Sequence, residues 1–546
     1  MKFKLLSLVL LCTSMFSFAQ LEVGNVNIDF GKEVTAKKGT VVQIAGEIDG
    51  VTYALASKKE TYYIQTFDAT NQDYLNSEQI DLDKVNGSKV SIEDLAVIED
   101  KIYVFASYYD NKNKQHIFAA YEVSKDLKLS AVQKVMATDV VSKSKRGQYF
   151  FEPSHDGLKY LLMHVNIDDR KEQLRYDINL IDKDLTLIQQ DYSEHQFEDR
   201  KDLEFSLDDF EVNEYGDIFI VLSDSWRNKK EKTTETHLTV HAYYASKNYV
   251  REVINVDLKG KKVLNCNVIN TLDGRLQLIG FYSGLRKSGR SEWRIEGIFD
   301  VALNTAYNSV VKEVFNEFTF DVKKKLIGER RAKKVKDLEP FYRNTHLIER
   351  DNGGVIVLSE WYTREIGSSS GGLLSFTPII YNTNEIIVTA LDANGRLEWS
   401  NVLPKEQNVS VVQMSIGLFA GGSNGSLSVG VGVMFPLSVL GEGPEFLSSI
   451  PLYENGKLSL LVNDDPKNIG ITDMDDVRKV RNVKKMIPVL FVFDDATGKM
   501  ERFDPAEFEK KQLVVRPGVT YKRGPGEYLI FASNKESKQL GKLIVQ

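Results

Sequence analysis

One kind of hairpin recurs along this 546-residue chain, and it constrains the fold more than any other feature. Each copy starts with a strand of alternating pattern that ends in an aromatic or aliphatic residue, often followed by Asp. A short polar turn follows, and then a second strand that opens with an apolar residue, clearly so at Leu127, Leu185, Leu397 and Met500. The first strands of the seven copies span residues 61–68, 116–124, 174–182, 237–244, 294–300, 386–392 and 489–494.

A second motif, a tight turn before a hydrophobic strand, precedes most of these hairpins. The turns are Asp49-Gly50, Asp156-Gly157, Gly216-Asp217, Asp273-Gly274 and Gly353-Gly354. Glycine adopts the positive φ that a two-residue hairpin requires. Together the motifs predict a four-stranded antiparallel unit of about 50 to 60 residues, the size of a propeller blade. In this prediction the inner strands are continuous apolar runs and the outer strands alternate.

The two ends of the chain predict how such an array closes. Residues 526–532 and 542–546 read as strands without a closing partner, and residues 21–30 as a strand without a hairpin of its own. Pairing these segments would complete the ring and cover both sheet edges. We therefore expect an all-β fold, a single β-propeller of eight four-stranded blades, with seven blades as the alternative. The propeller domain would span residues 20–546, because each blade of such a ring adds its own piece of core.

The first 19 residues have the pattern of a secretory signal peptide. Lys2 and Lys4 carry its positive charge, residues 5–11 are apolar, and Ser17-Phe18-Ala19 is a small-x-small cleavage site. A lipoprotein would use Cys12, but the preceding Leu11 is not the small residue that a lipobox needs. The sequence thus predicts export and a mature chain that begins at Gln20.

The composition of the mature chain narrows its function further. Without Lys2 and Lys4 it holds 68 basic residues against 77 acidic ones, which argues against nucleic-acid binding. No later stretch has the apolar length of a transmembrane helix. The one remaining cysteine, Cys266, has no internal disulfide partner and lies in a strand-like stretch, which indicates a buried structural thiol.

Three segments in the second half of the chain resemble motifs of a known family. They are DNGGVIVLSEWY at 351–362, EIIVTALDANGRLEW at 385–399 followed by LPKEQ at 403–407, and LLVNDDPKN at 460–468. Over about residues 320–470 the chain resembles an uncharacterised family of secreted, propeller-like proteins from Bacteroidetes. The resemblance implies an envelope setting and no known activity.

Several motifs resemble catalytic or metal-binding sites, but the sequence around each of them does not fit such a site. Residues 421–425 fit the pattern G-x-S-x-G, but an alternating, strand-like segment follows where a nucleophile elbow needs a helix. His237 and His241 lie four apart in a predicted strand, about 13 Å from each other, too far for one metal. The acidic clusters at 464–465 and 473–476 lack the spacing of a calcium loop. The sequence therefore predicts no catalytic residue, no cofactor and no metal.

Two insertions, at residues 317–345 and 417–452, decorate the predicted disc and would lie on its faces, where propellers carry function. The first is basic and the second is rich in Gly, Ser, Pro and apolar residues. A charge run can be a solvated helix face, and an apolar insertion can fold back over the disc or be covered by a partner. The candidate partner-binding residues are Lys323, Lys324, Lys325, Arg330, Arg331, Lys333, Lys334, Lys336, Phe435, Leu437, Leu440, Phe446 and Leu447.

These observations favour a non-catalytic propeller of the cell envelope, monomeric in isolation. It would bind or scaffold another macromolecule, such as an outer-membrane protein or a secretion complex. The alternative is a glycan-active or other hydrolase with its site in the central channel. We expect the protein in the periplasm or at the outer membrane. Secretion to the cell surface is the alternative, because 526–528 and 542–545 resemble the tail of a type IX sorting domain without its Pro-Asn-Pro opening.

Overall fold

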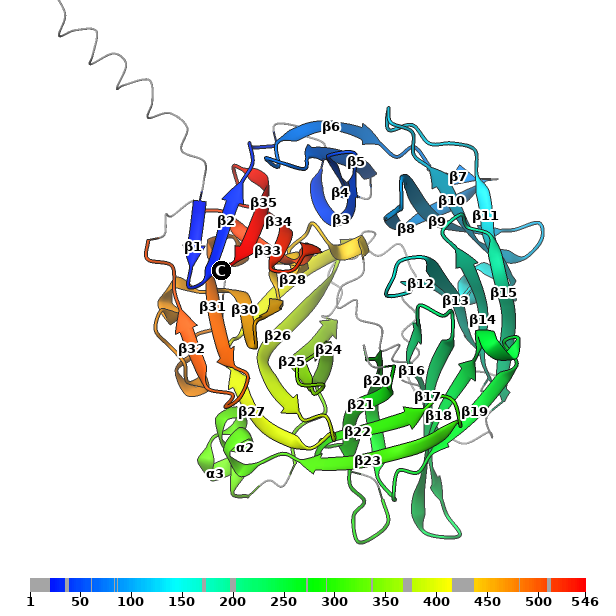
Figure 1. Cartoon of the computed structure of the whole chain (residues 1–546), viewed down its shortest axis with the longest axis vertical. Helices are drawn as coiled ribbons and strands as arrows, with labels where there is room; N and C mark the ends of the chain where they lie inside the picture. Colours follow the sequence, from blue (N-terminus) through cyan, green and yellow to red (C-terminus); the bar gives the residue numbers. More distant parts are fainter. Residues whose placement is uncertain are drawn as a thin grey trace, which may run out of the picture.

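The computed structural model describes residues 20–34, 39–59, 61–82, 84–85, 87–168, 173–196, 203–271, 274–290, 292–334, 337–366, 376–414, 437–480, 482–507 and 512–546. Within these residues, eight antiparallel sheets stand around a ring as the blades of a β-propeller (Figure 1). This confirms the predicted fold class and the preferred number of blades. Five sheets have four strands, and three carry a fifth strand.

The first four blades follow the chain in order, and each runs from the innermost strand to the outermost, except that the two-residue β7 precedes the innermost strand β8 and pairs with its start. Blade 1 contains β3 (Thr40–Ile48), β4 (Val51–Lys58), β5 (Thr61–Asp68) and β6 (Tyr74–Gln79). Blade 2 contains β7 (Lys84–Val85), β8 (Ser88–Ile98), β9 (Lys101–Asp110), β10 (Gln115–Glu122) and β11 (Gln133–Asp139). Blade 3 contains β12 (Gln148–Pro153), β13 (Lys159–Asp168), β14 (Gln173–Asp182) and β15 (Leu187–Gln196). Blade 4 contains β16 (Glu204–Val212), β17 (Ile218–Asn228), β18 (Thr233–Tyr243) and β19 (Arg251–Val256).

The next three blades repeat this arrangement. Blade 5 contains β20 (Lys262–Asn270), β21 (Leu276–Ser283), β22 (Gly297–Asn304) and β23 (Ser309–Glu317). Blade 6 contains β24 (Tyr342–Glu349), β25 (Val355–Ile366), β26 (Phe376–Leu391) and β27 (Leu397–Leu403), and β28 (Gln407–Met414) also pairs with β26. Blade 7 contains β29 (Ser449–Glu454), β30 (Lys457–Asp464), β31 (Ile487–Asp494) and β32 (Met500–Phe503).

The eighth blade joins the two ends of the chain. Its strands from the axis outward are β33 (Val514–Gly524), β34 (Glu527–Ser533), β35 (Lys538–Val545), β2 (Val26–Phe30) and β1 (Gln20–Val23). The register between β2 and β35 runs from Val26 opposite Val545 to Phe30 opposite Gly541. The predicted closure is confirmed, and Figure 1 shows the first and last strands in one sheet. One detail differs, because residues 20–30 form a hairpin of two strands around Gly24 instead of a single strand.

The burial pattern differs from the prediction that the inner strands are continuous apolar runs. The fully buried strands are the middle ones, such as β4, β9 and β21. The innermost strands β3, β16 and β20 alternate buried and half-buried residues. A middle strand is covered on both faces by the neighbouring blades, whereas an innermost strand has residues that point into the channel. The polar residues of the channel therefore come from the innermost strands.

The hydrophobic core lies between the blades. Buried side chains of the described residues gather into eight clusters, one for each pair of neighbouring blades; the cluster between blades 4 and 5, for example, joins Phe219 and Val240 to Leu278 and Phe299. The cluster between blades 1 and 2 also takes in Leu440, Phe446 and Leu447. Because each interface has its own core, the ring is stabilised around its whole circumference.

Helices are short and lie outside the sheets. The basic insertion forms α2 (Phe320–Ile327) and α3 (Glu329–Ala332) at the rim beside β27 (Figure 1). Thr319 caps α2, since its side chain accepts a hydrogen bond from the Val322 amide. Among the described residues, no helix is long and apolar enough to cross a membrane.

Candidate functional site

Five innermost strands carry a β-bulge at corresponding places. The register shifts end at Gln43 in β3, Asp94 in β8, Asp209 in β16, Asn265 in β20 and His346 in β24. A bulge opposes two residues to one, bends the strand and redirects the side chains. In β20 the neighbouring strand must also come close, because a Cβ on Gly280 would lie 2.0 Å from the Asn265 carbonyl oxygen.

Several bulge residues connect one blade to the next. Gln43 donates to Asp94 and to the Leu95 carbonyl oxygen. Asp209 accepts hydrogen bonds from the Val268 amide at 3.0 Å and from the Asn267 side chain at 3.2 Å. Burial raises the pKa of Asp94 to about 6 and that of Asp209 to about 8. These acids have partners on the neighbouring blade, so their role is to hold the blades in register.

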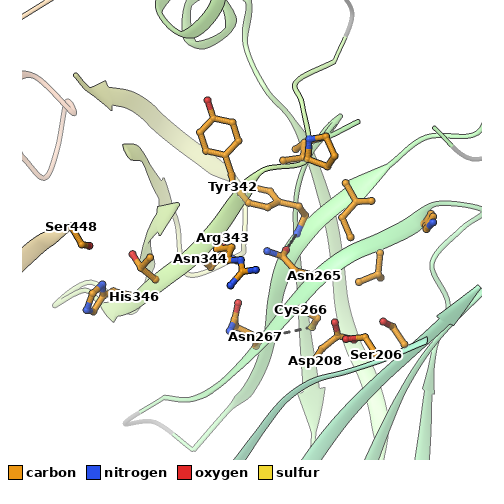
Figure 2. A pocket seen from close by; sticks show the side chains of 18 of the residues that line it. Ser206, Asp208, Asn265, Cys266, Asn267, Tyr342, Arg343, Asn344, His346 and Ser448 are labelled. Atoms are coloured by element: carbon orange, nitrogen blue, oxygen red, sulfur yellow. Dashed lines mark hydrogen bonds between the residues drawn. The ribbon is translucent and has the colours of Figure 1, made fainter. Parts of the chain in front are cut away.

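A cavity of about 540 Å³ lies in the channel against β16, β20 and β24 (Figure 2). This volume falls within the range of roughly 300–1,000 Å³ typical of small-molecule sites. The cavity is also lined by residues of the segment 440–451 and by β33. Its polar lining includes Ser206, Asp208, Ser223, Asn265, Asn267, Arg343, Asn344 and His346.

Asp208 is a buried acid in the lining of this cavity. It is the extra residue of the β16 bulge, its side chain is 3 % exposed, and its Oδ2 atom has no hydrogen-bond partner among the described residues. Burial raises its pKa to about 7, while hydrogen bonds from Ser223 and Ser206 act in the opposite direction. Near neutral pH, Asp208 can therefore either donate or accept a proton in a hydrogen bond.

Arg343 provides a positive charge on the other side of the cavity lining. Its guanidinium lies 4.4 Å from the centre of the Tyr362 ring, and Figure 2 shows the side chain extending toward Asn265 and Asn267. Arg343 is exposed to the solvent of the channel. The surrounding protein still desolvates its guanidinium, and this burial lowers its pKa. Among the described residues, the side chain of Arg343 has this ring contact but no ion pair or hydrogen bond.

Two pairs of charged or polar side chains also line the cavity. His237 Nδ1 lies 3.1 Å from Asp224 Oδ2, and Lys262 Nζ lies 2.5 Å from Glu204 Oε2. The Lys262 ammonium also lies 5.0 Å from the centre of the Trp293 ring, whose side chain is 55 % exposed. The cavity thus has an accessible aromatic ring beside charged groups that already have partners.

The remaining nucleophile and histidine candidates are inert. Cys266 is buried, as predicted, and burial raises its pKa, so it stays a thiol. Burial lowers the pKa of His346 to about 4, which keeps it neutral. His241 stacks on His195, with ring centres 5.0 Å apart, and takes no part in the cavity. The described residues contain no group of three or more metal-ligating side chains.

The apolar insertion is in part built into the propeller. Leu440, Phe446 and Leu447 are buried, and Leu437 packs against the same core cluster. Ser448 donates to Glu360, and the buried Arg516 pairs with Glu445 at 3.0 Å. These side chains are covered by the chain itself, so a partner reaches them only if the segment moves. Phe435 and the G-x-S-x-G motif lie outside the described residues.

The basic insertion pairs most of its charges locally. Lys324 and Lys333 contact Glu329, Lys323 contacts Glu317, Arg331 contacts Glu339, and Lys325 donates to Asn401. Lys323 is buried; Arg330 and Lys334 are exposed. Lys336 lies outside the described residues. The predicted docking role of this insertion remains a prediction, now centred on its exposed residues.

Sequence reasoning missed the residues of the cavity. Asp208 and Arg343 are 135 positions apart, and only the ring brings β16 and β24 to one channel. One signal was present, since Asp208-Asp209 interrupts the apolar strand FSLDDF with two acids, which a buried strand tolerates only for a reason. Nothing near Arg343 distinguishes it from a surface residue.

Three solved structures that are similar to this chain are distant from it in sequence. No protein-family model and no curated protein matches the chain. It is similar to the WD40 domain of SCAP from fission yeast, with 8% identity, 95% of this chain and 98% of that chain covered, and a TM-score of 0.35. It is similar to the Dos1 propeller, with 9% identity, 94% of each chain covered and a TM-score of 0.40. A Bacteroides caccae protein of unknown function shares 11% identity, with 64% of this chain and 92% of that chain covered and a TM-score of 0.24.

Proposed function

We propose that this protein is a non-catalytic β-propeller of the cell envelope that binds another macromolecule in its central channel. The observation that carries the proposal is the cavity of about 540 Å³ between β16, β20 and β24, whose lining includes polar atoms such as Asp208 Oδ2 that have no hydrogen-bond partner among the described residues. The signal-peptide pattern and the resemblance to secreted Bacteroidetes proteins support the envelope setting. Binding in the channel replaces the predicted docking at the apolar insertion, whose described side chains are mostly buried.

The arrangement of the polar groups supports binding over catalysis. Nucleophilic catalysis needs a hydroxyl or thiol hydrogen-bonded to a base. Within the described residues, the histidine that has a hydrogen-bond partner in the cavity, His237, bonds Asp224, and the Cys266 thiol contacts only the Asn267 carbonyl oxygen. Asp208 is flanked by Ser206 and Ser223, but a carboxyl of pKa about 7 beside two serines has no histidine to complete a relay.

The experiment that tests this proposal blocks the cavity. Ser206→Trp fills the space beside Asp208, while Ser246→Trp makes the same change on the exposed surface. Tagged wild-type and variant proteins are incubated with detergent-solubilised envelope, and the captured material is compared. We expect S246W to capture what the wild type captures and S206W to lose it, with both variants melting within a few degrees of the wild type. Undiminished capture by a folded S206W would contradict the proposal.

A hydrolase remains a second candidate because of Asp208. Burial raises its pKa to about 7, the property that a general acid needs at neutral pH. If the protein cleaves its ligand, Asp208→Asn should lower turnover by at least about 100-fold, as expected for loss of a general acid. Absence of turnover by the wild type, together with retained binding, would exclude this candidate.

A further inference from the structure

Two opposite charges face the cavity without neutralising each other. Arg343 has an aromatic partner, Tyr362, but no acidic one among the described residues. The Oδ2 atom of Asp208, 97 % buried with its side chain, has no donor. A buried carboxylate is unfavourable unless it is paired, which applies to Asp208. Arg343 is exposed to the channel and is open to an acidic ligand. Both groups would therefore gain from a ligand that brings an acceptor to one and a donor to the other.

The single guanidinium selects the charge of that ligand. Arginine binds a carboxylate through two parallel hydrogen bonds, and its stacking on Tyr362 orients it beforehand. A phosphate dianion would need more positive charge than the cavity offers, because Lys262 is already paired with Glu204. It would also be repelled by Asp208 when that group is ionised. A monoanionic carboxylate matches the site best.

The rest of the lining suits hydroxyl groups more than a peptide backbone. The Ser223 hydroxyl can donate and accept, and the Asn265 side chain can donate while its oxygen accepts from the Phe281 amide; sugar hydroxyls pair with both kinds of group. The exposed ring of Trp293 presents a negative π face on which the C–H groups of a pyranose can stack. An extended peptide would need a continuous strand edge to pair with, and the bulges of β16, β20 and β24 interrupt all three edges.

We propose that the central cavity binds a carboxylated carbohydrate, a uronic acid residue whose carboxylate pairs with Arg343 and whose hydroxyl donates to Asp208. This inference rests on the proposed function, since it names the ligand of the same cavity. It assigns Arg343 as the residue that selects the acidic sugar and Asp208 as the residue that orients its ring.

Calorimetry with defined probes tests this proposal. Wild-type protein is titrated with a galacturonic acid trimer and, for comparison, with the neutral galactose trimer. We expect the acidic trimer to bind at least about 10-fold more tightly than the neutral one, since a hydrogen-bonded charge pair contributes a factor of that order. Arg343→Met should remove this preference and leave both trimers equal. Arg343→Lys should keep a part of it, because the charge remains and the two-pronged geometry is lost.

A third pair of probes, a tetrapeptide with a free C-terminus and its amide, distinguishes the competing class of ligand. Equal binding of the two trimers to wild type, or an unchanged preference in R343M, would overturn the proposal. Tight binding of the free-acid peptide with no binding of the acidic trimer would overturn it as well. In each of these cases the proposed function survives if S206W still abolishes capture and S246W does not. If S206W binds the acidic trimer as wild type does, the cavity is not the site and both proposals fall.

Discussion

At the scale of single residues, the unusual feature of this propeller is a channel with buried acids of raised pKa. For Asp208 the value of about 7 lies above the value of about 3.9 for an unfolded chain. The folded state therefore holds a proton on Asp208 between these values that the unfolded state has released, so the contribution of Asp208 to stability falls as pH rises from about 4 to about 7 and then stays level.

Asp208→Asn should remove this dependence. The amide keeps the size of the side chain and an acceptor for Ser206 and Ser223 but carries no charge. Above about pH 7 the variant should be more stable than the wild type, by up to about 4 kcal/mol, and the difference should shrink to nothing near pH 4. Urea unfolding at pH 4.5, 6 and 8 measures it. A difference that does not change with pH would show that Asp208 is not neutral when buried.

The buried pair His116 and His164 should have the opposite effect. Both rings hydrogen-bond the Arg146 carbonyl oxygen, and burial lowers their pKa to about 3 and about 4. The unfolded chain binds protons below about pH 6.5 while the folded chain does not, so stability falls as pH falls toward 4. His164→Gln keeps a donor for that carbonyl and should reduce the acid sensitivity by about 3 kcal/mol between pH 7 and 4. Urea unfolding at pH 7 and pH 4 measures the loss of stability. An equal loss in the variant and the wild type would disprove this prediction.

Residue roles of this kind were the least predictable part of the molecule. Cys266 was correctly predicted as a buried thiol, because a lone cysteine in an apolar strand has few other uses. Arg343 and Asp208 were not identified, since they line one cavity only because strands of two different blades meet at the channel. Leu440, Phe446 and Leu447 were candidates for partner binding, with fold-back over the disc as the alternative, and the structure has them buried beside the Arg516–Glu445 ion pair. A sequence pattern shows apolar character but not what covers it.

At the scale of elements, the segment 440–448 is held to the channel by a buried ion pair. Arg516 of β33 contacts Glu445 at 3.0 Å, and Glu445 also accepts hydrogen bonds from the Gly441 and Gly443 amides. Both charged side chains are almost fully buried. Removing one partner of such a pair leaves the other charge unpaired in the interior, which costs about 3–5 kcal/mol.

Glu445→Gln should therefore lower the free energy of unfolding by about 3–5 kcal/mol. The matched control is Glu501→Gln, whose ion pair with Lys499 is exposed and should contribute less than about 1 kcal/mol. Chemical denaturation measures both. Equal effects of the two substitutions would mean that the buried pair does not hold this segment.

The element pattern itself was well predicted where repeats carried it. The seven hairpins correspond to the third and fourth strands of seven blades, because an alternating strand before a polar turn is a local signal. The apolar strands were predicted only as inner strands; they are the second strands of their blades, because burial in a propeller comes from the neighbouring blades and not from the axis. The sequence shows how apolar a strand is. The packing of the blades decides which position in the blade the apolar strand takes.

At the scale of the whole molecule, the ring has one joint made of sequence-distant segments. β2 pairs with β35, so residues about 500 positions apart complete one sheet. Contacts of this separation form late, because the entropy of closing so long a loop must be overcome first. The closure was predictable because unpaired strands at both ends of a repeat array have few other partners.

Deleting residues 20–30 tests the joint. The deletion removes Val26, Ile28 and Phe30, all buried, and exposes the edge of β35 to solvent. It also removes the buried Val23, and burial of four such side chains contributes roughly 6–12 kcal/mol, so the variant should melt well below the full ring and aggregate through the open edge. Ile28→Ala should give a smaller loss of about 2–5 kcal/mol, and Asp29→Asn, on the exposed side of the same strand, should give almost none. Scanning calorimetry and light scattering on the four proteins give the answer. If the deleted protein melts with the full chain, the eighth blade is stable without β1 and β2, and the two ends of the chain do not carry the closure.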